Sequence, residues 1–323
     1  MIDLIYIILA LLAGIIAGVV TGLIPGVHVN LIAVLLFSIP LAFISQLSPI
    51  ILVVFIVAMM LTHTFLDFIP SIFLGAPDTD TELSILPGHE LLSKGRGYEA
   101  VIYTAYGSAL GILIILLLTP IFIFLLPKIF VYLKSVIFLI LILASIYLIT
   151  IEKKSRLYAL IVFILAGFLG ISSSSLAIEN SLLPLLTGLF GSSSLITSII
   201  KKEKLPKQRI TRFWNIKVEI KELIKTGFAS MASAPLCTFL PSLGSGQAAV
   251  IGSDLIGETN RKQFLVLLGS INTIVAGLAL ITFYAIAETR TGAVMAIEQI
   301  IGSITTLHLY MLMTIILISG IAG

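Results

Sequence analysis

Long apolar stretches, each about the length of a membrane span, follow one another along most of the chain. A helix needs about 20 mainly apolar residues to cross the hydrocarbon core of a bilayer. Nine stretches meet this requirement and are predicted to be membrane helices: residues 2–22, 27–45, 48–66, 99–126, 130–150, 157–176, 180–200, 262–287 and 292–320. We therefore expect an all-α polytopic membrane protein with about 9–11 membrane segments.

Two further stretches, 68–93 and 226–258, are apolar at both ends but interrupted in the middle. Small, polar and proline residues form the first interruption at 75–82 and the second interruption at 241–247. Irregular backbone persists at membrane depth only where protein or a wet cavity surrounds it. Each stretch is therefore predicted to be a broken or re-entrant helix hairpin.

The two interruptions belong to a pattern that recurs at a spacing of 164 residues. Pro77 and Pro241 each stand eleven residues before a Gly-x-acid-Leu-aliphatic pattern, at 88–92 and at 252–256. Broken segments at matching positions in two halves indicate the binding site of a transporter. We therefore predict two related membrane domains, residues 1–156 and 157–323, and we favour inverted over parallel repeats.

Composition agrees with a lipid environment. Hydrophobic residues make up 59% of the 323 residues and charged residues only 11%, against roughly 25% charged in soluble domains. The single cysteine, Cys237, excludes an internal disulfide and a cysteine-based zinc site, and we expect no metal cofactor. The loop 201–225 holds nine basic residues against three glutamates. This excess indicates orientation rather than nucleic-acid binding, and it places the loop on the cytoplasmic side of a multi-pass protein of the cell membrane.

The residues around the first interruption resemble those of a known family. Residues 69–79 read Ile-Pro-Ser-Ile-Phe-Leu-Gly-Ala-Pro-Asp-Thr, residues 22–26 read Gly-Leu-Ile-Pro-Gly, and residues 235–246 form a second run rich in Pro, Gly and Ser. These runs resemble the TctA-type permease subunit of the tripartite tricarboxylate transporters, here as a short variant. The chain departs from the family pattern at Asp78 and beside Pro241, at Ser242, where glycine is usual.

The resemblance implies ion-driven secondary transport of small di- or tricarboxylates. It also implies two partners, a small membrane subunit and an extracytoplasmic binding protein. A homodimer stays an open alternative, and membrane lipids surround any such protein.

A half-helix that begins inside the membrane presents unpaired N–H groups and a partial positive charge, which suit an anion. We expect two such N-termini, near Thr79–Thr81 and near Ser245–Gln247, to oppose one another across the substrate. The alternative is that their polar residues only cap the helices. The predicted substrate-binding residues are Pro25, Gly26, His28, Asn30, Pro77, Thr79, Thr81, Ser242, Gly244, Ser245, Gly246 and Gln247.

The first interruption also carries three carboxylates, Asp78, Asp80 and Glu82. An ionised Asp at the bilayer centre costs roughly 2.5–3.5 kcal/mol on insertion scales, so these groups are not expected to face lipid. We predict that they bind Na⁺ or carry a proton, together with His63 and Asp67, which share a helix face four residues apart. The alternatives are a solvated surface for the three carboxylates and a structural hydrogen bond for the pair.

Arg96, Arg261 and Lys262 follow the two repeated motifs. They are predicted to anchor the topology, or to attract an anionic headgroup at an entrance. The main functional hypothesis is a permease for a small organic anion coupled to Na⁺ or H⁺. The alternative is a translocase for an anionic polyprenyl-phosphate lipid carrier. An enzyme is not expected, because the chain has no histidine–glutamate metal motif and no convincing nucleophile–base pair.

Overall fold

A computed structural model describes most of the chain. The described residues are 4–38, 48–76, 80–152, 155–176, 196, 200, 206–240, 243–257 and 259–323. Within these ranges the structure is helical, and they contain no strand. Two compact units form: Met1–Ile129 together with Lys204–Gly323, and Phe130–Glu203. Helix α7 (Gly97–Ile151) runs from the first unit into the second, which also holds α8 (Arg156–Ser174).

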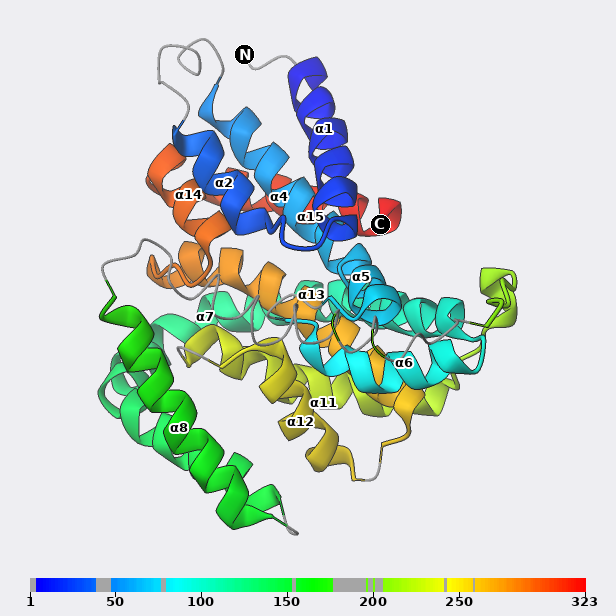
Figure 1. Cartoon of the computed structure of the whole chain (residues 1–323). Helices are drawn as coiled ribbons and strands as arrows, with labels where there is room; N and C mark the ends of the chain where they lie inside the picture. Colours follow the sequence, from blue (N-terminus) through cyan, green and yellow to red (C-terminus); the bar gives the residue numbers. More distant parts are fainter. Residues whose placement is uncertain are drawn as a thin grey trace. The chain divides into compact units, whose positions relative to one another are not determined.

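The first unit contains the other α-helices of the described residues, shown in Figure 1. They are α1 (Leu4–Leu23), α2 (Val29–Ser38), α4 (Pro49–Leu66), α5 (Phe68–Leu74), α6 (Ile85–Ser93), α11 (Ile220–Phe239), α12 (Ser245–Ile256), α13 (Arg261–Ile286), α14 (Gly292–Ile301) and α15 (Thr306–Ala322). Helices α1, α14 and α15 pack around α4, whereas α11 and α12 pack against α13.

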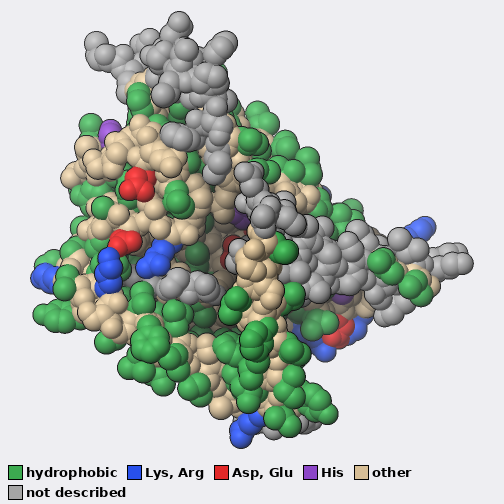
Figure 2. All heavy atoms as spheres, turned by 60° about the vertical axis from the view of Figure 1, so that its left-hand side comes forward, with side chains coloured by type: hydrophobic (Ala, Val, Ile, Leu, Met, Phe, Trp, Pro, Cys, Tyr) green, Lys and Arg blue, Asp and Glu red, His purple; other side chains and the backbone are tan. Residues whose placement is uncertain are grey.

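Five helical stretches of the described chain are long and apolar enough to cross a membrane: Leu4–Leu23, Pro49–Leu74, Gly97–Ile151, Arg156–Ser173 and Arg261–Ile286. The shorter helices α14 and α15 are also apolar. Hydrophobic side chains cover much of the face shown in Figure 2. The prediction of an all-α polytopic membrane protein is therefore confirmed.

Glycines allow several helices of the first unit to approach backbone to backbone. Gly14 and Gly18 of α1 face α4, where an added Cβ would lie 2.5 Å from the carbonyl oxygen of Phe55 and 2.6 Å from that of Met59. Gly22 continues this stripe. Small residues at such spacing favour close helix packing in lipid. The sequence contains this stripe, but apolar periodicity alone does not reveal it.

Replacing Gly18 with alanine is expected to destabilise the first unit. The new methyl group meets main-chain oxygen, which cannot move aside, and such overpacking costs roughly 1–3 kcal/mol. The matched control is Gly167→Ala in α8, where a Cβ meets nothing within 4 Å. The thermal midpoint in detergent should fall for the first variant only, and equal midpoints for both would contradict this packing.

The interruptions and two predicted helix boundaries can be compared with the structure. Both interrupted stretches are indeed broken: α5 ends before Gly75 (φ 63°) and α6 begins at Ile85, while α11 and α12 are separated by 240–244. The separation of 99–126 from 130–150 is wrong, because α7 continues through Pro120 and Pro127. The single span 292–320 is also wrong, because Gly302 (φ 68°) ends α14 before α15 begins.

The predicted span 180–200 lies outside the described residues, apart from residues 196 and 200. The division into two repeat domains, 1–156 and 157–323, stays a prediction. The two compact units reflect contacts within the chain, and contacts do not test whether two halves share the same fold.

Candidate functional site

The two interruptions meet directly in the first unit. The Ser245 backbone N–H donates to Oδ1 of Asp80 at 3.2 Å, and the Ser245 hydroxyl donates to the same oxygen at 2.9 Å. One residue later, a Cβ on Gly246 would lie 2.6 Å from Oε1 of Glu82. Because Asp80 and Ser245 are 165 residues apart in the chain, this contact is a tertiary one. A carboxylate here complements the partial positive charge at the start of α12.

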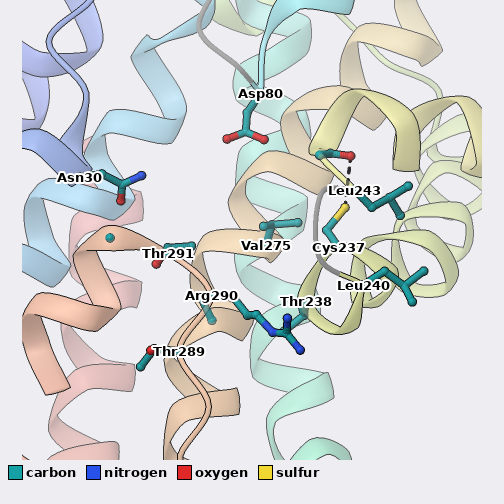
Figure 3. A pocket seen from close by; sticks show the side chains of 13 residues that line it. Asn30, Asp80, Cys237, Thr238, Leu240, Leu243, Val275, Thr289, Arg290 and Thr291 are labelled. Carbon is teal, nitrogen blue, oxygen red and sulfur yellow. Dashed lines mark hydrogen bonds between the residues drawn. The ribbon is translucent and has the colours of Figure 1, made fainter. Parts of the chain in front are cut away.

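A cavity of about 470 Å³ lies beside this contact. Asp80 borders it from the first interruption, Leu243 and Gly244 border it from the second, and Leu240 borders it from the end of α11. Figure 3 shows Asn30 and Thr291 on one side of the cavity and Cys237, Leu240 and Leu243 on the other. Residues that are far apart in the sequence therefore line the same cavity within the first unit.

Two helix N-termini reach the cavity, but one of them differs from the expected pair. Helix α12 begins there after its N-cap Gly244, as the sequence predicts. The other helix is α14, whose N-cap Thr291 and first residue Gly292 line the cavity. The N-terminus of α6 was expected instead, but its N-cap Ser84 is not among the lining residues.

Hydrogen bonding explains why the start of α6 does not face the cavity. The Thr81 hydroxyl lies 2.6 Å from the Ser71 hydroxyl, and the Thr81 carbonyl accepts a bond from the Ser84 hydroxyl. Thr81 is fully buried, and a 3₁₀ turn at Glu82–Ser84 precedes α6. The polar groups of this segment thus hold the first interruption against α5.

The cavity also contains a basic side chain that is not among the site residues predicted from the sequence. Among the described residues that line the cavity, Arg290 is the one Lys or Arg. It precedes the α14 N-cap, and Figure 3 shows its side chain extending toward Thr238 of α11. An arginine at the start of a long apolar run is a signal that could have identified it.

A smaller inner cavity of about 70 Å³ adjoins the larger one, and Asn30, Asp80, Val275 and Thr291 border both. His28, His63, Thr64, Asp67 and Asn272 complete its polar lining. Asp80 therefore stands at the boundary between the two cavities.

The buried polar groups of the inner cavity form one network. Nδ2 of Asn272 donates to Oδ2 of Asp67 at 2.7 Å, and Nε2 of His63 lies 3.9 Å from the same oxygen. The other ring nitrogen of His63 lies 3.0 Å from the Thr21 hydroxyl, and the His28 ring centroid is 5.3 Å from that of His63. His63 and Asp67 thus lie close together at a distance longer than a hydrogen bond, Asn272 links Asp67 to α13, and a role of the pair in ion coupling stays a prediction.

The other predicted site residues lie near these cavities rather than in the larger one. Pro25 and Gly26 line a narrow recess that they share with His63 and Asp67. Gln247 accepts a hydrogen bond from the Gly244 N–H at 3.0 Å and so completes the turn before α12. Pro77, Asp78, Thr79 and Ser242 lie outside the described residues.

Arg96, Arg261 and Lys262 line a separate pocket that has no residue in common with either cavity. Arg96 pairs with Glu99, and Arg261 pairs with Glu90. Lys262 lies over the Tyr103 ring, with its Nζ 5.6 Å from the centroid. The structure thus brings these three residues together in one pocket, and their predicted role as topology anchors or as a headgroup entrance stays a prediction.

The chain has apolar helices of spanning length and a polar cavity between two broken segments. This combination is typical of a membrane transport protein rather than of a membrane anchor without a cavity. Residues 8–322 match the model of the tripartite tricarboxylate transporter TctA family. The chain belongs to this family and is therefore a multi-pass permease component, as its motifs indicated.

The chain is also similar to a curated protein that is itself uncharacterized. The uncharacterized protein MJ1079 of Methanocaldococcus jannaschii is 35% identical over 311 residues, which cover 94% of this chain and 74% of the relative. No solved structure matches the chain.

Proposed function

We propose that the protein carries a small organic anion of the di- or tricarboxylate class across the cell membrane, and that the anion binds in the 470 Å³ cavity. One observation supports this most strongly: Arg290 and the N-termini of α12 and α14 line the same cavity. Helix N-termini favour anions through their N–H groups and partial positive charge. The volume also lies within the range of about 300–1,000 Å³ that is usual for small-molecule sites.

Arg290 gives the site its preference for carboxylates. A guanidinium forms two parallel hydrogen bonds with one carboxylate, which a single ammonium group cannot do. A di- or tricarboxylate has further carboxylates for the helix N-termini that Gly244 and Thr291 cap. The proposal therefore assigns one carboxylate to Arg290 and another to the start of α12 or α14.

Asp80 couples the anion to a cation in this proposal. Its carboxylate borders both cavities and repels an incoming anion unless a positive charge neutralises it. A Na⁺ ion or a proton in the inner cavity, next to Asp80, Asp67 and His63, removes that repulsion. Anion and cation then favour each other's binding, which is the thermodynamic requirement for cotransport.

Glu82 and Asp78 belong to the same acidic segment and stay in the proposed coupling set. Glu82 lies against Gly246, so its charge acts at the contact between the two interruptions. We also propose a small membrane subunit and an extracytoplasmic binding protein as partners. The loop 201–225 lies on the cytoplasmic side in this proposal.

A thermal-shift screen of the purified protein tests this function. We expect citrate or another di- or tricarboxylate to raise the thermal midpoint, and the rise to be larger with Na⁺ or at lower pH. Monocarboxylates of equal ionic strength are the control. Stabilisation by a polyprenyl phosphate alone would instead support the lipid translocase and contradict the carboxylate assignment.

A further inference from the structure

A basic pocket of about 400 Å³ lies in the first unit, separate from the transport cavities. Five cationic side chains line it: Lys94, Arg96, Lys217, Arg261 and Lys262. Three glutamates, Glu90, Glu219 and Glu222, also line it, which leaves a formal charge of five minus three, or +2. The pocket therefore favours an anion.

Ion pairing reduces this charge but does not cancel it: Arg96 pairs with Glu99, which does not line the pocket, so the formal charge with Glu99 included is five minus four, or +1. Glu90 accepts a hydrogen bond from Lys94 at 2.8 Å and also pairs with Arg261. The hydrogen bond from Lys94 and the nearby charge of Arg261 lower the pKa of Glu90, so Glu90 stays ionised and holds both cations in place. Lys217 belongs to the loop 201–225 and adds a further positive charge to the pocket lining.

Three helices begin at the basic pocket. Arg96 directly precedes α7, Glu219 is the N-cap of α11, and Asn260 is the N-cap of α13. All three residues line the pocket. The partial positive charges of three helix N-termini thus add to the side-chain charge, and this combination suits a phosphate group.

An apolar stripe begins beside the pocket and runs along α11. Ile220, Ile224 and Phe228 are four residues apart and therefore share one helix face. Their side chains are 75%, 55% and 67% exposed. A small soluble anion has no apolar group that could contact this stripe, whereas the acyl chain of a lipid would pack against it.

We propose that the basic pocket binds the phosphate of an anionic phospholipid, with an acyl chain along the Ile220–Phe228 stripe. Basic pockets between membrane helices on the cytoplasmic side are suited to anionic headgroups, and Lys217 belongs to the loop that the positive-inside rule places on that side. This site is independent of the carboxylate cavity.

Native mass spectrometry of the purified protein with phosphatidylglycerol or phosphatidylcholine tests the proposal. The test variant is Lys217→Glu with Lys262→Glu, and the matched control is Lys221→Glu with Lys225→Glu. The control lysines belong to α11 and carry the same charge, but they do not line the pocket. We expect the test variant to lose about tenfold or more in phosphatidylglycerol occupancy and the control to change less than twofold.

Three outcomes would overturn the proposal. They are equal losses in the test and control variants, equal wild-type occupancy by phosphatidylglycerol and phosphatidylcholine, and binding of glycerol phosphate as tight as that of the lipid. The milder pair Lys217→Gln with Lys262→Gln should give a smaller loss of the same sign. Citrate stabilisation should persist in every variant, which separates this test from that of the transport cavity.

Discussion

Replacing Arg290 with alanine is expected to lower carboxylate affinity by about tenfold or more, because Arg290 is half-buried and hydrogen bonds to charged groups contribute roughly 1.5–3 kcal/mol. Arg290 is the one basic side chain among the described residues that line the larger cavity. Without it, a carboxylate keeps only the helix N-termini as a positive environment. Isothermal titration calorimetry with the purified protein, and uptake into proteoliposomes, measure the loss.

Two further variants make this result specific. Arg290→Lys keeps the charge but loses the paired hydrogen bonds, so its affinity should fall between those of the wild type and the alanine variant. Arg212→Ala removes an exposed arginine that does not line the cavity, and it should bind normally. An Arg290→Ala protein with wild-type affinity would exclude Arg290 from the site.

Replacing Asp80 with asparagine is expected to uncouple carboxylate binding from the cation. The asparagine oxygen still accepts the two bonds from Ser245, so the contact between the interruptions persists while the negative charge is lost. Uptake should then proceed without a Na⁺ or proton gradient, and the gradient should no longer accelerate it. Proteoliposome uptake under each gradient separately also identifies the coupling ion.

Asp80→Ala and Ser245→Ala separate charge from structure. Asp80→Ala loses both the charge and the acceptor, and it should also lower the thermal midpoint. Ser245→Ala loses one hydrogen bond but keeps the carboxylate, so coupling should survive. If Asp80→Asn retains full dependence on the gradient, the coupling carboxylate lies elsewhere, with Asp67 as the next candidate.

The sequence predicts the interruptions well because their signal is local. Proline, glycine and acidic residues within apolar runs disfavour a continuous helix, and the start of α12 at Ser245 follows from the Gly-Ser-Gly pattern at 244–246. The family resemblance depends on the same residues and is confirmed.

The parts of the site that depend on tertiary packing are not predicted. The run 292–320 is mainly apolar, with Glu298 as its one Asp, Glu, Lys or Arg, so hydrophobicity alone does not reveal the break at Gly302 or the separate helix α14. Arg290 then looks like a loop residue, although the start of α14 brings it to the cavity. Thr81 shows the converse case, because its hydroxyl lies 2.6 Å from that of Ser71, a tertiary contact that the sequence does not reveal, and its role in substrate binding stays a prediction.

Chemical modification of the protein's own single thiol tests most directly whether a di- or tricarboxylate binds in the larger cavity. Cys237 is the only cysteine in the chain, and it lines the larger cavity opposite Asn30. The measurement is the rate at which a small methanethiosulfonate reagent modifies Cys237, with and without a saturating di- or tricarboxylate. The account predicts that the carboxylate slows modification severalfold and that Arg290→Ala abolishes this protection. Modification at the same rate with and without a carboxylate that demonstrably binds would contradict a substrate site in this cavity.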